Sequence, residues 1–534
     1  MNLLRYYNTI RFLKPEQLYF QLLYKAKGVL RKLLGSKSCY TRYKQGKWLS
    51  FAAPLIEKPL SYKGNNEFEF LNVTNTFRGV WDDNSKGALW RYNLNYMDFL
   101  LQPSMGVKEG LEWIERFIAS MPQNSVADDP YPISLRGINW IKFVSLHYDS
   151  FSPEQLRVID TALYSQYCIL EKKVERHLLA NHYLENGFSL WFAAYYFNDS
   201  HFFKAAEKII SSQLDEQVLS DGAHYELSPM YHCVILERLL DCYNIIDKEM
   251  HRSLSLFMLD KIKLMLGWLE SVVMSDGNIP LLNDSALGVA PSPQEIFAYA
   301  RALGLEWGAT TLGESGYRKF GGDNYDVFVD VAALGPSYNL GHSHADTFTF
   351  VMNVGGKPFI IDTGTSTYTA GERRSYERST LAHNTISVNG SDSSRVWGAF
   401  RCAERASVKL LDEDNYSVTA SHNGYKSHAL SVTRSFMSRG AEFGIVDEVS
   451  GADKNTHLVA SFHLAPEVVV ESVGVDKVVT SSGVLCFTGA TSITIEPVEV
   501  AFSYNMLSPS TRISVSFSKR LSSVVLPKEN VDSL

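Results

Sequence analysis

Residues 321–334, GGDNYDVFVDVAAL, mark the point at which the spacing of the apolar residues changes. Upstream, from about residue 100 to 310, apolar residues recur every three or four positions, as the buried face of a helix requires. Downstream, short runs rich in Val, Ile, Phe and Thr alternate with Gly, Asn, Asp and Ser, which is typical of strands joined by turns. The sequence therefore predicts a helical half followed by a β half.

Helix-start signals support the helical half. Ser152-Pro153 and Ser228-Pro229 each place a capping side chain before a proline, and proline is favoured at the first position of a helix. The strand-like runs continue to the C-terminus, which is more strand than a single small sheet holds. We predict an α+β chain of three parts: a basic helical segment at residues 1–60, an all-α domain at 61–318 and a large antiparallel β-sandwich at 319–534.

The composition excludes several classes of protein. With 45% apolar and 20% charged residues, the 534-residue chain is neither disordered nor collagen-like nor a small disulfide scaffold. Its net charge of −7 argues against a nucleic-acid protein, because phosphate binding needs a basic surface. The aromatic content of 12% fits large cores or a cleft lined with rings, such as those that bind carbohydrates.

The first 50 residues are an exception to the acidic charge. They hold eleven Lys or Arg residues and one acid, Glu16, interleaved with apolar and aromatic residues in helical spacing. Two positions for this segment stay open, an anionic membrane surface and the acidic remainder of the chain, and we favour the second. Charges interrupt the start at Arg5, Arg11 and Lys14, so no secretory signal is predicted, and no transmembrane span is found.

The six cysteines predict a reducing compartment. They show no Cys-Xaa-Xaa-Cys spacing, which argues against a thiolate zinc site, and two of them fall on one predicted helix, which argues against a disulfide framework. We therefore expect a cytoplasmic protein, with peripheral contact at the inner face of the membrane as the alternative for the basic segment.

A polar stripe interrupts one apolar helix of the helical half. Its members recur at offsets of three, four and seven and so share a face: His182, Glu185, Asn186 and Ser189. Stripes that face solvent usually carry Lys and Glu, so we favour a stripe that lines a polar cleft.

Tyr231 lies in the first turn of the helix that Ser228 is predicted to cap. The helix dipole and the unpaired N–H groups there favour an anion, so we expect a lowered pKa for this phenol and a role in proton transfer. A buried core tyrosine at the start of an apolar stripe is an equally good interpretation.

Histidines and carboxylates gather near the start of the β half. His342 and His344 precede one predicted strand, Asp362 ends the next, and His383 follows. Imidazole and carboxylate groups are the usual ligands of Zn²⁺, which makes a metal site a candidate. His344 and Asp362 reach one ion only if the chain bends ahead of the intervening strand. A hydrogen-bonded structural cluster stays open as the alternative.

Several motifs together resemble the heparinase II/III family of polysaccharide lyases. NHYLENGFSLWFAAYYF (181–197), DGAHYELSPMYHCVILERLLD (221–241) and SDGNIPLLNDS (275–285) are similar to its helical domain. Residues 341–390, which begin GHSHADTFTFVMNV, are similar to its β-sandwich. WRYNLNYMDFL and YPISLRGINWIKF are similar to its earlier helices, so the resemblance runs from about residue 90 to about 400.

The resemblance implies an incomplete (α/α) toroid followed by an antiparallel β-sandwich. It also implies β-elimination on a uronic-acid polysaccharide, in which the carboxylate is neutralised, a base removes the C5 proton and an acid protonates the departing O4. Matched residue by residue, Asn181 and His182 neutralise the carboxylate, Tyr231 donates the proton, and His342 is a base or second proton-transfer residue.

The same resemblance implies metal and substrate contacts. His344, Asp362 and His383 match a metal-bound cluster, with Zn²⁺ expected in a structural role. Substrate contacts are expected beside the Asn181–His182 pair, in a loop of the β half and on the helical side of the cleft, where a tryptophan stacks on a sugar ring: Glu185, Arg374, Tyr376, Arg378, Arg136, Asn139 and Trp140.

The start of the chain departs from the secreted lyases of the family. It resembles that of members encoded with surface-polysaccharide assembly proteins, which implies the cell's own capsule or exopolysaccharide as the acidic substrate. Two other functions stay open. A glycoside hydrolase would use two carboxylates among Glu185, Glu226 and Asp276, and a non-catalytic polysaccharide-binding protein would need no proton-transfer set.

Overall fold

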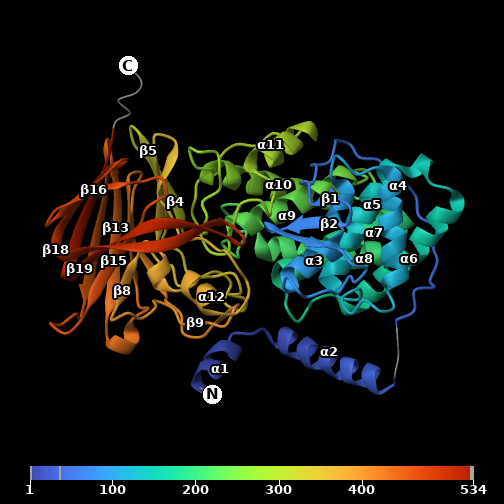
Figure 1. Cartoon of the computed structure of the whole chain (residues 1–534), viewed down its shortest axis with the longest axis horizontal. Coiled ribbons are helices and arrows are strands. Elements are labelled where there is room, and N and C mark those ends of the chain that lie inside the picture. Colours follow the sequence, from blue (N-terminus) through green and yellow to red (C-terminus); the bar gives the residue numbers. More distant parts are fainter. Residues whose placement is uncertain (1–2, 35–37, 529–534) are drawn as a thin grey trace.

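The computed structural model describes residues 3–34 and 38–528 and places the helical and β halves side by side (Figure 1). The last helix of the helical half, α11, is Pro293–Ala302, and the first strand of the β half, β4, is Tyr317–Gly321. The change from helices to strands therefore falls between residues 302 and 317, just before the change in apolar spacing.

Two rows of helices form the helical half. Each member of the inner row contacts the next: α3 (Ala88–Tyr96), α5 (Pro130–Leu146), α7 (Ala180–Phe197), α9 (Pro229–Asn244) and α11. The three central helices, α5, α7 and α9, are almost completely buried. The outer row has a solvent-facing side: α4 (Val107–Ser120), α6 (Pro153–Lys173), α8 (Ser200–Gln217) and α10 (Arg252–Val272). Two such layers of alternating helices are the incomplete toroid that the resemblance implies.

Both predicted helix caps are present. Ser152 Oγ accepts the backbone N–H of Gln155 at 3.2 Å and completes a capping box at the start of α6. Ser228 Oγ accepts the backbone N–H of Tyr231 at 3.3 Å at the start of α9. These caps fix the first turns of the helices, and with them the position of Tyr231.

A small antiparallel sheet precedes the helices and was not expected from the sequence. Its strands are β1 (Tyr62–Gly64), β2 (Glu67–Phe70) and β3 (Val73–Thr76). Trp90 of α3 donates its indole N–H to Val73 O at 2.8 Å, so the sheet caps the end of the inner row. Strands of three or four residues are too short to show a clear alternating pattern.

Two antiparallel sheets pack face to face in the β half. The smaller has the order β4, β5 (Tyr325–Asp330), β6 (Phe350–Val354) and β7 (Lys357–Ile360). The larger follows the order β11 (Val408–Glu413), β12 (Ser417–His422), β13 (Ser431–Arg439), β14 (Glu442–Ser450), β19 (Met506–Pro527), β18 (Gly483–Ser503), β17 (Lys477–Thr480) and β16 (Val470–Val473). β15 (Leu458–His463) joins β19 to β8 (Ile386–Val388). Phe350 of the smaller sheet contacts Phe436 and Phe462 of the larger at ring distances of 6.0 and 6.1 Å, which makes the predicted sandwich.

The long hairpin of β18 and β19 extends from the sandwich to the helical half (Figure 1). Tyr504 at its tip is 3% exposed and belongs to the helical core. Asn72, in the turn between β2 and β3, donates its side-chain N–H to Tyr504 O at 2.8 Å. The two halves are therefore joined by the C-terminal hairpin as well as by the chain between α11 and β4.

Two basic N-terminal helices, α1 (Leu3–Ile10) and α2 (Pro15–Leu33), lie against both halves. Asn8 of α1 donates to Glu404 Oε1 at 2.9 Å, and Tyr24 of α2 donates to Val174 O at 2.8 Å. The favoured interpretation, contact with the chain's own body, is therefore confirmed for one face of the segment. Within residues 3–34 and 38–528, no helix is long and apolar enough to cross a membrane.

Candidate active site

The inner helices bring their N-terminal ends together at one place. Tyr131, His182 and Tyr231 lie in the first turns of α5, α7 and α9. The Tyr131 and His182 rings are 4.5 Å apart, and the Tyr231 ring is 4.0 Å from that of His342. Because a helix N-terminus carries unpaired N–H groups and a partial positive charge, this convergence favours an anion.

His342 reaches this place from the β half. It lies in the loop between β5 and β6, and its Nε2 is 3.5 Å from Asn181 Nδ2 and 3.6 Å from Glu226 Oε2. Asn181, Tyr231 and His342 therefore meet at the boundary between the two halves. His182, the fourth residue assigned to catalysis by resemblance, follows Asn181 with its ring against that of Tyr131.

Asp284, for which the sequence predicted no role, holds His342 in place. We call Asn181, His182, Tyr231, His342 and Asp284 the cluster. Its buried carboxylate accepts His342 Nδ1 at 2.9 Å, His344 Nε2 at 2.9 Å, and Arg374 Nη1 and Nη2 at 2.5 and 2.7 Å. Burial alone would raise the pKa of Asp284, but Arg374 and the two histidines outweigh it and hold the pKa well below 3.8. The carboxylate orients His342 with Nδ1 toward Asp284 and Nε2 toward Asn181.

Tyr368 is a second residue that the sequence analysis missed. Its hydroxyl is 3.2 Å from the hydroxyl of Tyr231. Its ring is 6.0 Å from that of His342. The resemblance assigns a different tyrosine of the same loop, Tyr376, to the substrate, and the sequence of the loop carries no signal that separates the two tyrosines.

The expected lowering of the Tyr231 pKa was wrong. Burial is the largest effect and raises the pKa of Tyr231 above its ordinary value of 10.0, and the carboxylates of Asp284 and Glu226 add to it. The hydrogen bond with Tyr368 opposes this increase but does not cancel it. The phenol therefore keeps its proton at neutral pH, which is the state that a general acid needs.

Asn181 is held in place by a carboxylate. Its backbone N–H donates to Glu226 Oε1 at 3.0 Å, and its side-chain N–H₂ lies 3.0 and 3.1 Å from the two carboxylate oxygens. The backbone next to these residues is strained: residues with φ between 52° and 60° flank the site at Leu179, Ala180, Leu227 and Asn283. Such strain gathers at sites whose geometry the surrounding fold must impose.

His182 forms an ion pair with Glu175. Its Nδ1 is 3.1 Å from Glu175 Oε1, and the His182 side chain is 36% exposed. Burial of the ring opposes protonation, but the Glu175 carboxylate outweighs it and raises the pKa of His182 above 6.5. A protonated His182 at the mouth of the site can bind and neutralise a carboxylate.

Three predicted cleft residues on α5 lie in the core instead. Arg136 and Trp140 are fully buried, and Asn139 is 1% exposed. Arg136 donates to Ala127 O at 2.8 Å, and Trp140 donates its indole N–H to Met97 Sδ at 3.2 Å. The prediction that they contact substrate was wrong, because α5 belongs to the inner row and has almost no solvent face.

The remaining predicted substrate residues also lack access to the site. Glu185 is 1% exposed and lies 3.2 Å from Arg238 Nε. Arg374 is buried against Asp284, and Arg378 is buried and donates to Ser343 O at 2.8 Å, which fixes the loop of His342. Tyr376 has a buried hydroxyl without a hydrogen-bond partner, with its ring beside Arg373. We therefore correct the role of Arg374 and Arg378 to positioning of the cluster.

The predicted metal ligands are His344, Asp362 and His383, and His344 shares Asp284 with His342. The His344 and His383 rings are 5.3 Å apart, and His383 Nδ1 is 2.7 Å from Asp362 Oδ2. His344 Nδ1 and His383 Nε2 are buried and have no hydrogen-bond partner. Imidazole nitrogens are common ligands of Zn²⁺, so these two atoms fit a zinc site. Among the residues that the structure describes, however, no three His, Cys, Asp or Glu side chains have the arrangement of a metal site. Both oxygens of Asp362 are already hydrogen-bonded, Oδ2 to His383 Nδ1 and Oδ1 to the backbone N–H of Gly364 at 2.9 Å.

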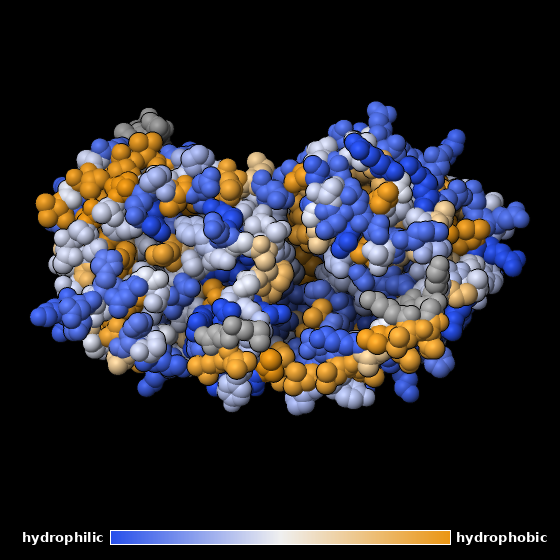
Figure 2. All heavy atoms as spheres, turned by 60° about the horizontal axis from the view of Figure 1, so that its bottom comes forward, coloured by the Kyte–Doolittle hydropathy of each residue, from blue (hydrophilic) through white to orange (hydrophobic). Residues whose placement is uncertain are grey.

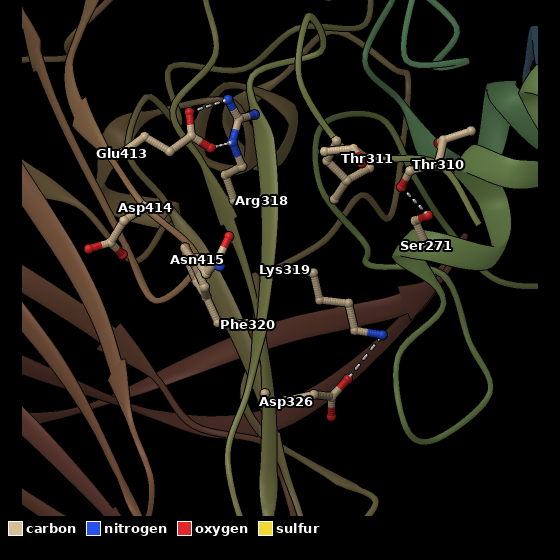
Figure 3. A pocket seen from close by; sticks show the side chains of 12 residues that line it. Ser271, Thr310, Thr311, Arg318, Lys319, Phe320, Asp326, Glu413, Asp414 and Asn415 are labelled. Carbon is tan, nitrogen blue, oxygen red and sulfur yellow. Dashed lines mark hydrogen bonds and ion pairs between the residues drawn. The ribbon is translucent and has the colours of Figure 1, made fainter.

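A separate cavity of about 490 Å³ lies between the end of α10 and strands β4 and β11 (Figure 3). Four of its five charged side chains form ion pairs with one another: Arg318 with Glu413, and Lys319 with Asp326 at 3.7 Å. The fifth, Asp414, accepts the backbone N–H of Tyr416 at 2.8 Å. It contains none of the predicted site residues. The cavity therefore does not compete with the cluster around His342 as the candidate active site.

Two family models match this chain. The model described as "Heparinase II/III N-terminus" matches residues 142–300, and the one described as "Heparinase II/III-like, C-terminal" matches residues 306–527. The matched ranges include Asn181, His182, Tyr231, Asp284 and His342 but not Tyr131.

Curated relatives match parts of the chain. It is 26% identical over 282 residues to a heparin-sulfate lyase from Bacteroides stercoris, covering 47% of this chain and 40% of the lyase. It is 24% identical over 209 residues to a heparin-sulfate lyase from Pedobacter heparinus, covering 34% of this chain and 31% of the lyase. The chain thus spans less than half the length of these relatives.

Solved structures match most of the chain. A heparinase III aligns with a TM-score of 0.62 and 18% identity over 86% of this chain and 82% of that one. The heparan sulfate lyase of Pedobacter heparinus aligns with a TM-score of 0.59 and 16% identity over 91% of this chain and 87% of that one. These similarities confirm the predicted fold class, a helical region followed by an antiparallel β-sheet domain.

Proposed function

Because the chain belongs to the heparinase II/III family, we propose that it is a polysaccharide lyase that cleaves a uronic-acid polymer by β-elimination. The observation that carries this proposal is the meeting of Asn181, Tyr231 and His342 at the N-terminal ends of α7 and α9. A uronate carboxylate suits this position, because the helix ends favour an anion and the Glu175 carboxylate raises the pKa of His182, which favours the protonated ring.

Each residue has a distinct task in the proposed reaction. Asn181 and His182 bind the uronate carboxylate, which makes the C5 proton more acidic. His342 takes that proton at Nε2, and Asp284, bonded to Nδ1 at 2.9 Å, stabilises the imidazolium that forms. Tyr231, which keeps its proton at neutral pH, donates it to the departing O4.

The carboxylates are poorly placed for the hydrolase alternative. Glu185 is paired with Arg238, and Glu226 is bonded to Asn181. Asp276 accepts the backbone N–H of Asn278 at 3.1 Å in a turn outside the cluster. Hydrolysis needs one carboxyl group that donates a proton and a second that activates water or attacks the sugar. The lyase chemistry, by contrast, uses the groups that meet at His342.

We also propose a structural Zn²⁺ ion held by His344, Asp362 and His383. The ring nitrogens His344 Nδ1 and His383 Nε2, which have no hydrogen-bond partner, support this proposal. The ion would rigidify the loop that carries both His342 and His344. Elemental analysis of protein purified without chelator tests this proposal. Less than about 0.2 zinc per chain would contradict it, since structural sites bind zinc tightly.

The cell's own capsule or exopolysaccharide is the substrate source that we propose, and the cytoplasm is the proposed compartment. The six cysteines, all within the described residues and all free, support a reducing environment. Incubation with the polysaccharide of the producing cell, alongside other uronate polymers, tests the choice of substrate.

The lyase proposal is tested by the ultraviolet absorbance of the unsaturated uronate, which hydrolysis does not produce. Tyr231→Phe should lower kcat about 10²- to 10⁴-fold with substrate binding nearly unchanged, because the hydroxyl acts in the transition state. Tyr376→Phe, which removes a hydroxyl outside the cluster, is the matched control and should retain wild-type turnover. Equal rates for Tyr231→Phe and wild type would refute the assignment. Reducing ends released without absorbance would favour the hydrolase, and binding without either product would favour the binding protein.

A further inference from the structure

The N-terminal helices α1 and α2 leave an apolar face uncovered. Their inner sides contact the body, as Tyr6 does at 5.0 Å from the Trp397 ring. Their outer sides carry large apolar side chains that are 37% to 79% exposed: Leu3, Leu4, Tyr7, Ile10, Leu18, Tyr19, Leu22, Val29, Leu30 and Leu33. We call these ten residues the outer face of α1 and α2. Figure 2 shows them as a hydrophobic band along the lower edge of the molecule.

This outer face is larger than isolated exposed apolar residues would explain. Single leucines on a protein surface are common, but ten large apolar side chains on two consecutive helices form a continuous patch. Such patches mark surfaces that bind another protein or a membrane.

The charge around the outer face indicates what covers it. Residues 3–34 contain seven Lys or Arg residues and one acid, whereas the whole chain carries a net charge of −7. Lys25 and Lys27 are exposed on α2, and Arg11 is exposed directly after α1. Helices with one apolar face and Lys or Arg beside it lie in the headgroup region of anionic membranes. A second copy of this chain would bring the same positive charge and be repelled.

We propose that the outer face of α1 and α2 docks the protein on an anionic lipid surface. Ile10, at the edge of the outer face, and the inner sides of the same helices line a cavity of about 370 Å³, together with Leu178 and Phe400. Leu178 lies three residues before Asn181, and the Phe400 ring is 6.3 Å from that of His342. Docking would therefore hold the candidate active site close to the membrane. The docking proposal itself does not depend on lyase activity.

Vesicle sedimentation of the full chain tests the proposal. Wild-type protein should bind vesicles with about 30% phosphatidylserine at least about tenfold more tightly than pure phosphatidylcholine vesicles, and salt should weaken that binding. Leu22→Glu with Leu30→Glu should reduce binding about tenfold or more per leucine, because the buried leucine area is lost. Lys25→Glu with Lys27→Glu should remove most of the preference for phosphatidylserine.

The matched control places two glutamates on other exposed apolar positions. Val469→Glu with Val475→Glu adds the same charge to side chains that are 61% and 92% exposed in the β half, and it should bind vesicles as wild type does. Circular dichroism melting should be unchanged in every variant, since all the altered side chains are exposed. Wild-type protein that fails to sediment, equal binding of the leucine variant, or a wild-type dimer that the leucine variant abolishes while vesicles are ignored would each overturn the proposal.

Discussion

Replacing Glu175 with Gln should lower the pKa of His182, because Glu175 is what holds that pKa above 6.5. The two side chains meet at 3.1 Å. At the effective dielectric near a protein surface such a contact is worth about 5 kcal/mol. Since 36% of the His182 side chain is exposed, solvent screening reduces this to about 1 to 2 kcal/mol.

The pKa can be measured without a substrate. Nuclear magnetic resonance of the His182 ring, assigned by its loss in His182→Asn, should show the wild-type titration above pH 6.5 and the Glu175→Gln titration at a lower pH. With a cleavable polymer, the alkaline limb of kcat/KM should shift by the same amount, because the uronate is bound by the protonated ring. Glu207→Gln, an exposed change on α8, is the charge control and should leave both curves unmoved.

The same pair links stability to pH. A group whose pKa is raised by folding stabilises the protein fully below its unfolded pKa and loses that contribution as pH rises through the folded pKa. The melting temperatures of wild type and Glu175→Gln should therefore differ most below about pH 6.5 and converge in alkaline solution. A His182 pKa at or below 6.5 in wild type, or one that Glu175→Gln leaves unchanged, would refute the reasoning.

Two further predictions concern the core and the metal. Trp140→Ala should destabilise the protein by about 3 to 5 kcal/mol in chemical unfolding, while turnover and KM of the folded fraction stay at wild-type values; a raised KM with unchanged stability would restore its role at the sugar. His383→Ala should lower bound zinc and make melting insensitive to chelator, whereas wild type should melt at a lower temperature after chelator treatment; equal zinc content in both proteins would remove His383 from the ligands.

Residues at helix starts were predictable from the sequence. Ser228-Pro229 fixes where α9 begins, and that placed Tyr231 in the first turn, where the structure has it. The pKa of Tyr231 was not predictable in the same way. It depends on burial and on Asp284 and Glu226, which come from other parts of the chain, and these outweigh the local helix dipole.

The errors on α5 have a related cause. The sequence of α5, PYPISLRGINWIKFVSL, has apolar residues on all sides, which indicates a helix that is buried all round. The polar and aromatic side chains of such a helix necessarily face other helices. Asp284 and Tyr368 were missed because neither lies in a periodic pattern, and their partners are 58 and 137 positions away in sequence. Only the assembled fold places them beside His342 and Tyr231.

The C-terminal hairpin has a consequence for the order in which the molecule forms during synthesis. Tyr504 fills part of the helical core and is bonded to Asn72, 432 positions earlier. A ribosome therefore adds 432 residues after Asn72 before Tyr504 is available to complete the core of the helical half. Contacts of such sequence separation form late, because a long loop must close before they repay its entropy. The core of the helical half is therefore completed only after the β18–β19 hairpin has been synthesised. Until then the nascent chain is incompletely packed and can be bound by chaperones.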